Sequence, residues 1–95
     1  MSAQEAVLAL RSVKLNGRRT GVFAYPDRIE LVDEDGVRAI PLTDVVRISF
    51  KSGVRKGRLT ITTGEGPLEI RGLRMRDVGV AYRILVSLAA DRNRG

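Results

Sequence analysis

The fold is decided by one stretch, residues 58–90, which reads RLTITTGEGPLEIRGLRMRDVGVAYRILVSLAA. In its first part apolar and polar residues alternate, so that Leu59 and Ile61 fall on one side of an extended chain and the threonines between them on the other. A period of two residues indicates β-strands, which this stretch predicts at 58–63 and 68–71, on either side of a glycine-rich turn.

The period changes after Asp77. Apolar residues then recur every three or four positions, as Val78, Ala81 and Leu85 do, and this is the spacing of an amphipathic helix. Asp77 is expected to be the N-cap, because its carboxylate can accept a free backbone N–H of the first turn. We therefore expect one helix that reaches about residue 90, followed by a frayed tail at 91–95.

Turn residues divide the first half of the chain in the same way. The clearest signal is Asp35-Gly36 between two apolar runs, which predicts a tight hairpin because glycine accepts the positive φ that such a turn needs. Further along, Val46, Ile48 and Phe50 alternate with polar residues and are expected to face the core. Five strands are predicted in this half, at 7–15, 22–25, 29–31, 37–40 and 45–50.

Three segments are similar to those of bacterial pleckstrin-homology-like (PH-like) and GRAM domains. Residues 21–31, GVFAYPDRIEL, resemble their pattern of glycine, strand, turn, Arg-Leu and strand. Residues 37–45, VRAIPLTDV, resemble their Ile-Pro-Leu-x-Asp-Ile segment, and residues 59–64, LTITTG, their Leu-x-Ile-x-Thr strand with the glycine one position early. Seven strands followed by one amphipathic helix is also the element order of the PH superfold, and the match runs from about residue 7 to residue 90.

This resemblance implies a fold and leaves the function open. It implies a mainly β domain, a barrel or roll of seven antiparallel strands in two near-orthogonal sheets, with the helix capping one open end. Another small β-barrel or roll with a terminal helix is the alternative. Since the superfold hosts lipid, peptide and protein binders, it does not by itself assign a ligand.

The composition predicts one domain and no catalytic centre. With 95 residues the chain is long enough for a single domain, 1–95. It contains no histidine and no cysteine, so the commonest general base, the commonest metal ligand and the strongest nucleophile are missing. The acidic run at 33–35 lacks the ligand spacing of a calcium loop. We therefore expect no enzyme, no cofactor and no metal site.

The sequence also carries a prediction about location. No apolar run approaches the ~18 residues of a membrane span, and the N-terminus lacks the pattern of a signal peptide. The absence of cysteine fits a reducing compartment, and the preference for arginine over lysine suggests a bacterial source with a GC-rich genome. We expect a cytoplasmic protein that is at most peripheral at a membrane.

The charge is strongly basic, with 17 Lys and Arg against 11 Asp and Glu and a net charge of +6. A basic domain tends to bind nucleic acid, anionic lipid or an acidic protein. Nucleic acid is the least expected of these, because single-strand binders interleave cations with aromatic residues and only 4% of the residues here are aromatic. Two loops and their flanks carry the candidates for polyanion binding, which are Lys14, Arg18, Arg19, Lys51, Arg55, Lys56 and Arg58.

Other polar and aromatic residues are expected to have structural roles. The loop around 14–19 loosely resembles the one that holds an inositol phosphate in lipid-binding PH domains, but it lacks their downstream arginine. Arg71, Arg74 and Arg76 form a third basic group, in which Arg74 is expected to pair with nearby acids. The aromatic pair at positions 23 and 25 is expected to pack in the core.

The helix carries more apolar surface than it needs to cover one open end of the sheet. Val80 and Ile84 widen one edge of its apolar stripe and Val86 widens the other, which makes these three residues candidates for an interface. We therefore predict a non-catalytic binding module that acts through protein–protein contact or self-association, at the helix edge or at an open sheet edge. The alternative is peripheral binding to an anionic membrane or another polyanion through the basic loops.

Overall fold

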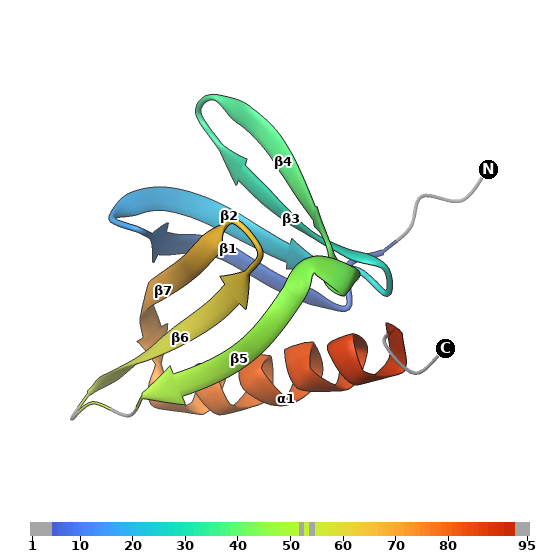
Figure 1. Cartoon of the computed structure of the whole chain (residues 1–95). Coiled ribbons are helices and arrows are strands. Elements are labelled where there is room, and N and C mark those ends of the chain that lie inside the picture. The colour runs from blue at the N-terminus through green and yellow to red at the C-terminus, as the bar shows by residue number, and fades with distance from the viewer. Residues whose placement is uncertain (1–4, 52, 54, 93–95) are drawn as a thin grey trace.

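Seven antiparallel strands and one C-terminal helix form the protein in the computed structural model, which describes residues 5–51, 53 and 55–92 (Figure 1). The mainly β prediction and the terminal helix are confirmed. The strands are β1 (Leu8–Leu15), β2 (Arg18–Ala24), β3 (Arg28–Asp33), β4 (Gly36–Pro41), β5 (Val45–Lys51), β6 (Lys56–Thr63) and β7 (Gly66–Arg74). A short 3-10 turn, η1 (Leu42–Asp44), separates β4 from β5, and the helix α1 spans Met75–Arg92.

All seven strands belong to one sheet, in the order β4-β3-β2-β1-β7-β6-β5. The structure thus shows a single sheet in place of the two near-orthogonal sheets expected. This sheet is not closed, because β4 and β5 are its two edges and do not pair with each other. Its two halves, β1–β4 and β5–β7, are joined in the hydrogen-bonded ladder where β1 pairs with β7, through Lys14 opposite Arg71 and Leu15 opposite Ile70.

Both strands at this junction are bulged. The register between β1 and β2 shifts between Leu10 and Val13, and the register between β6 and β7 shifts beside Arg58. In β7 the extra residue is Gly72, whose φ of 88° suits a glycine because a side chain is strained there. A β-bulge bends its strand and increases the local twist, so these two bulges let the sheet turn where its halves join.

The core lies between the sheet and α1, which runs along β5, β6 and β7 and also contacts η1 (Figure 1). Val78, Ala81 and Leu85 of the helix are fully buried, as the spacing of apolar residues predicts. The helix begins at Met75, so the prediction of Asp77 as the N-cap is wrong and this residue lies in the first turn. The helix also includes the first two residues of the predicted tail, whereas 93–95 lie outside the described residues.

Strand β5 departs from the predicted alternation. Its register against β6 shifts between Val45 and Arg47, which turns Val45 into the core and leaves the side chain of Val46 outside, with Val46 73% exposed. Phe50 is 47% exposed and packs edge-to-face on Tyr82 of the helix, with ring centroids 4.8 Å apart. Of the residues predicted to face the core, Val46 is therefore on the surface and Phe50 lies at the margin.

The expected core placement of Phe23 and Tyr25 is also wrong. Val22 and Ala24 of β2 are fully buried, so alternation along this strand turns the half-buried Phe23 to the other side of the sheet, and Tyr25, which directly follows β2, is also half-buried. The guanidinium carbon of Arg28 lies 4.2 Å from the centroid of the Tyr25 ring, which is a cation–π contact.

Gly57 of β6 allows the close approach of the helix. A Cβ atom at this position would lie 2.8 Å from Cγ2 of Val78 and 3.2 Å from Sδ of Met75. We predict that Gly57→Ala lowers the free energy of unfolding by about 1–3 kcal/mol, because the added methyl group forces the packed helix to shift. Urea unfolding measures the change. Gly64→Ala is the control, since a Cβ there meets nothing within 4 Å; equal effects of the two substitutions would contradict this account of the packing.

Candidate functional site

Five basic side chains form one line across the sheet. The register pairs Lys51 with Arg58, Lys14 with Arg71 and Lys14 with Arg19. The bulge in β7 sets Arg58 opposite Arg71 and Gly72, because Gly57 pairs with Leu73 and Leu59 with Ile70. Each of the five adjacent strands β5, β6, β7, β1 and β2 therefore contributes one cation. We call this set the basic row: Lys51, Arg58, Arg71, Lys14 and Arg19.

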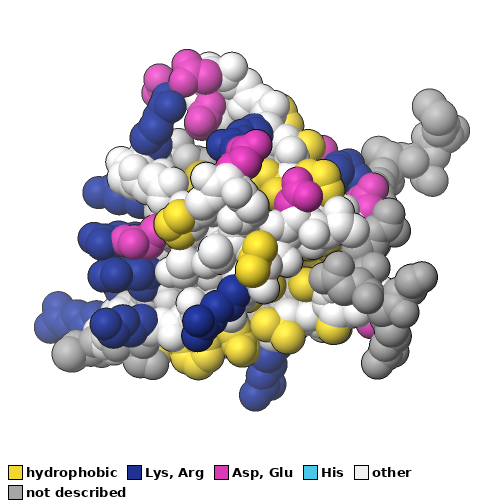
Figure 2. All heavy atoms as spheres, viewed as in Figure 1, with side chains coloured by type: hydrophobic (Ala, Val, Ile, Leu, Met, Phe, Trp, Pro, Cys, Tyr) yellow, Lys and Arg dark blue, Asp and Glu magenta, His cyan; other side chains and the backbone are white. Residues whose placement is uncertain are grey.

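The side chains of the row lie on the outer face of the sheet. Arg58 is half-buried and the other four are exposed. The chain neighbours of Lys14, Arg58 and Arg71 include Leu15, Leu59 and Ile70. These three are buried on the opposite face of the sheet, in the core. Alternation along each strand thus separates an apolar inner face from a cationic outer face. Figure 2 shows Lys and Arg side chains gathered along one side of the molecule, where β1, β2, β7 and the β5–β6 turn lie in Figure 1.

Like charges placed directly opposite each other destabilise a sheet, and one acidic residue offsets part of this repulsion. Nε of Arg71 donates a hydrogen bond to Oε1 of Glu69 at 2.5 Å, and Nε of Arg58 lies 3.7 Å from the same oxygen. For Lys14, Arg19 and Lys51 the described residues provide no ion pair. The row therefore retains a net positive charge, which is concentrated at its two ends.

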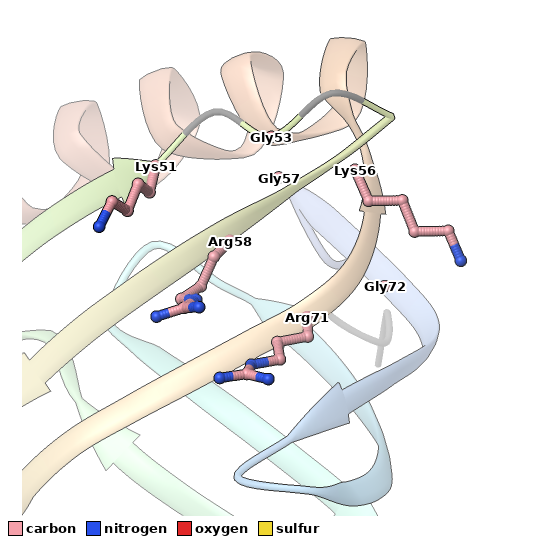
Figure 3. A pocket seen from close by; sticks show the side chains of 7 residues that line it. All are labelled: Lys51, Gly53, Lys56, Gly57, Arg58, Arg71 and Gly72. Carbon is pink, nitrogen blue, oxygen red and sulfur yellow. The ribbon is translucent and has the colours of Figure 1, made fainter.

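Two shallow hollows lie along the row. The first, of about 320 Å³, is bordered by Lys51, Arg58, Arg71 and the backbone of glycines at 53, 57 and 72. Figure 3 shows the side chains of Lys51, Arg58 and Arg71 extending to the same side, whereas Lys56 extends away from them. The second hollow, of about 450 Å³, is bordered by residues that include Lys14, Arg19, Lys56 and Arg71. No acidic side chain lines either hollow among the described residues.

The predicted polyanion candidates have different positions in the structure. Lys14, Arg19, Lys51 and Arg58 belong to the basic row, and Lys56 borders both hollows. Arg55 is exposed in the β5–β6 loop and lines neither hollow. The structure therefore brings most of two sequence-distant clusters onto one surface, since β7 lies between β6 and β1 in the sheet.

Arg18 is engaged elsewhere. Its Nη2 donates a hydrogen bond of 2.8 Å to Oδ2 of Asp35, at the tip of the β3–β4 hairpin. This hydrogen bond, together with the charges of Asp35 and Asp33, raises the pKa of Arg18 above its ordinary value. Oδ1 of Asp33 in turn accepts a hydrogen bond from the backbone N–H of Asp35 at 2.8 Å. The acidic hairpin tip is thus a structural partner of Arg18, and among the described residues no group of three or more acidic side chains is placed to hold a metal ion.

Arg71 is the functional candidate that sequence reasoning missed. The sequence groups it with Arg74 and Arg76 before the helix, whereas the structure places it at the centre of the row, opposite Lys14. The alternation of Leu68, Ile70 and Arg71 does predict that Arg71 faces outward. The missing signal is the pairing of β7 with β1, which depends on the whole topology. Arg74, for its part, lies opposite another cation, Lys56.

The three interface candidates on the helix do not form one surface. Val80 is 54% exposed and lines a groove between the start of α1 and residues 8–13 of β1. Val86 is 38% exposed and is one helical turn from Tyr82, which contacts Phe50 on the β5 side. Ile84 is half-buried, on the same side of the helix as Val80 by helical spacing. The candidates therefore flank opposite edges of the helix.

No known protein-family model matches the chain, and no curated protein matches its sequence. Within the described part of the chain, no helix combines the length and the apolar character needed to cross a bilayer. The resemblance to PH-like domains accordingly stays a prediction.

Lys14 lies between two cations, Arg71 and Arg19, on neighbouring strands. We predict that Lys14→Gln raises the free energy of unfolding by about 0.5 kcal/mol at low ionic strength, because it removes two like-charge contacts across the sheet. The gain should fade at 0.5 M salt, where charges are screened over about 4 Å. Urea unfolding at both salt concentrations tests this, with Arg83→Gln on the exposed side of α1 as the charge-matched control. A loss of stability in Lys14→Gln at low salt would contradict the repulsion described here.

Proposed function

We propose that this protein is a non-catalytic module that binds polyanions through the basic row. The observation that carries the proposal is the register, which sets cations from five adjacent strands side by side. Such an arrangement lowers the stability of the free protein, so it is more readily explained by a ligand than by solubility, which scattered charges provide at no cost. An anion that bound the row would relieve the repulsion.

The chemistry of the row suits phosphate and sulfate groups. Arginine presents a planar fork that can donate two hydrogen bonds to one such group, and lysine adds a mobile point charge. Arg58 and Arg71 lie together in the middle of the row with Lys14 and Lys51 beyond them, so several anionic groups can be bound at once. The shallow hollows beside these side chains leave room for the groups of a polymer.

A catalytic role has no support in the residues of the chain. The sequence has neither histidine nor cysteine, and cations with glycines and small residues line the hollows beside the row. A cationic surface can stabilise an anion, but a reaction also needs a group that moves a proton or attacks a substrate. We therefore propose binding alone.

We further propose that the fold is PH-like. The support is the order of seven antiparallel strands followed by a C-terminal helix, together with the division of the sheet into a four-stranded and a three-stranded half. In this proposal the halves β1–β4 and β5–β7 correspond to the two sheets of that superfold, and the bulges near the β1–β7 junction supply the bend between them.

Contact with another protein is the second candidate function. The observation that favours it is the open edge of the sheet at β5, where Val46 and Phe50 are exposed. An edge strand has free backbone N–H and C=O groups that can pair with a partner strand. If a second copy uses this edge, light scattering should show a concentration-dependent dimer that Val46→Lys weakens. A strict monomer for both proteins would end the case for self-association.

The polyanion proposal can be tested on a heparin column, since heparin is a linear sulfated polymer. We predict that the wild-type protein elutes at higher salt than the double variant Arg58→Gln/Arg71→Gln, because the middle of the row is lost. The matched control is Arg11→Gln/Arg83→Gln, which changes the net charge equally at two exposed positions that border neither hollow. Elution of both double variants at the same salt concentration would show that only net charge matters and would refute the proposed site.

A further inference from the structure

We infer that Glu69 is a positioning residue of the basic row, whose carboxylate holds Arg58 and Arg71 as a pair with their terminal nitrogens directed to an anion. This inference rests on the proposed function and deepens it, because it describes how the row engages any anionic group. It is carried by three observations: both arginines contact one oxygen of Glu69, both do so through Nε, and the backbone of Glu69 is fixed on both sides.

The sheet places Glu69 within reach of both arginines. Glu69 and Arg71 are two residues apart in β7, so their side chains lie on the same face of the sheet. In the neighbouring strand β6, Glu69 pairs with Thr60, and Arg58 is two residues from Thr60 on that same outer face. Figure 3 shows the side chains of Arg58 and Arg71 extending in the same direction from these two strands. One carboxylate can therefore contact two guanidinium groups.

Both contacts use the nitrogen nearest the side-chain stem. Nε of Arg71 donates a hydrogen bond of 2.5 Å to Oε1 of Glu69, and Nε of Arg58 lies 3.7 Å from the same oxygen. Within the described part of the chain, no hydrogen bond or ion pair involves the Nη nitrogens of these two arginines. The Nη nitrogens can donate two parallel hydrogen bonds to one anionic group. Glu69 thus engages each arginine at a point that leaves this fork available.

The position of Glu69 is fixed by its backbone. Its N–H donates a hydrogen bond of 2.9 Å to Oδ1 of Asn16, and its C=O accepts one of 2.9 Å from the backbone N–H of Asn16. Asn16 belongs to the turn between β1 and β2, where its φ of 50° is a conformation that asparagine adopts more readily than most residues. On the other side Glu69 pairs with Thr60 of β6. The carboxylate is therefore attached to a firmly held part of the sheet.

Positioning affects binding here because the two arginines are exposed, with 42% of the Arg58 side chain and 58% of the Arg71 side chain accessible to solvent. A long exposed side chain loses rotamer freedom when it binds a ligand, and this loss weakens binding. A contact that restricts the guanidinium group beforehand removes part of the loss. The negative charge of the carboxylate has the opposite effect, since it repels an incoming anion. Glu69 therefore acts on affinity in two ways of opposite sign.

Two substitutions of Glu69 separate these effects, because both remove the charge and only one removes the acceptor. Glu69→Gln keeps a side-chain oxygen at the same reach, whereas Glu69→Ala leaves Nε of Arg71 without it. We predict that Glu69→Gln binds short-chain polyphosphate about fivefold more tightly than Glu69→Ala, as measured by calorimetric titration at low salt. The matched pair is Glu65→Gln and Glu65→Ala, at a carboxylate that pairs with Arg38 and borders neither hollow. These two variants should bind with equal affinity.

Equal affinities of Glu69→Gln and Glu69→Ala would overturn the inference and leave the proposed function standing, since the row would then bind without help from Glu69. A second measurement needs no ligand: the NMR signal of the Nε–H group of Arg71, which the hydrogen bond protects from exchange with water. This signal should be present in the wild-type protein and in Glu69→Gln and lost in Glu69→Ala. Equal signals in all three proteins would also overturn the inference. Absence of polyphosphate binding by all three would refute both the inference and the proposed function.

Discussion

The structure depends on one narrow junction, where β1 pairs with β7 through two residue pairs. On the inner face Leu15 and Ile70 are buried together, and this burial holds the two halves of the sheet against the core. On the outer face the same register places Lys14 opposite Arg71. Because a strand alternates its side chains, the apolar contact inside cannot form without the like-charge contact outside. The same pairing of β1 with β7 therefore produces both the buried junction of the fold and the centre of the candidate site.

The remaining charges are arranged so that they support the fold and leave the row free. Arg18 joins the first hairpin to Asp35 at the tip of the β3–β4 hairpin, and Arg38 of β4 pairs with Glu65 in the β6–β7 turn. The second contact links the two halves of the sheet at a distance from their junction. Both pairs are exposed, so each adds little stability. Neither of the two acidic side chains, Asp35 and Glu65, lines the hollows beside the row.

Features that depend on the local spacing of apolar residues could be predicted from the sequence. Features that depend on the register between paired strands could not. The strand pattern and the apolar stripe through Val78 and Leu85 were sufficient for a β-sheet with one terminal helix. The exposure of Val46 was not predictable, because a bulge leaves no signature in the alternation itself. Arg71 was missed because its neighbours come from β1, which is more than fifty residues earlier in the chain. A resemblance of local segments cannot supply such pairings, and the PH-like assignment remains a proposal.

The central claim is that an anionic polymer binds where β5, β6, β7, β1 and β2 align their cations. The most direct measurement is an NMR titration of the ¹⁵N-labelled protein with short-chain polyphosphate. We predict saturable shifts of the backbone amides of Lys14, Arg19, Lys51, Arg58 and Arg71, with the amides of α1 and of the β3–β4 hairpin tip unchanged. Shifts that are centred on the helix, or that spread evenly over all exposed arginines, would contradict the account.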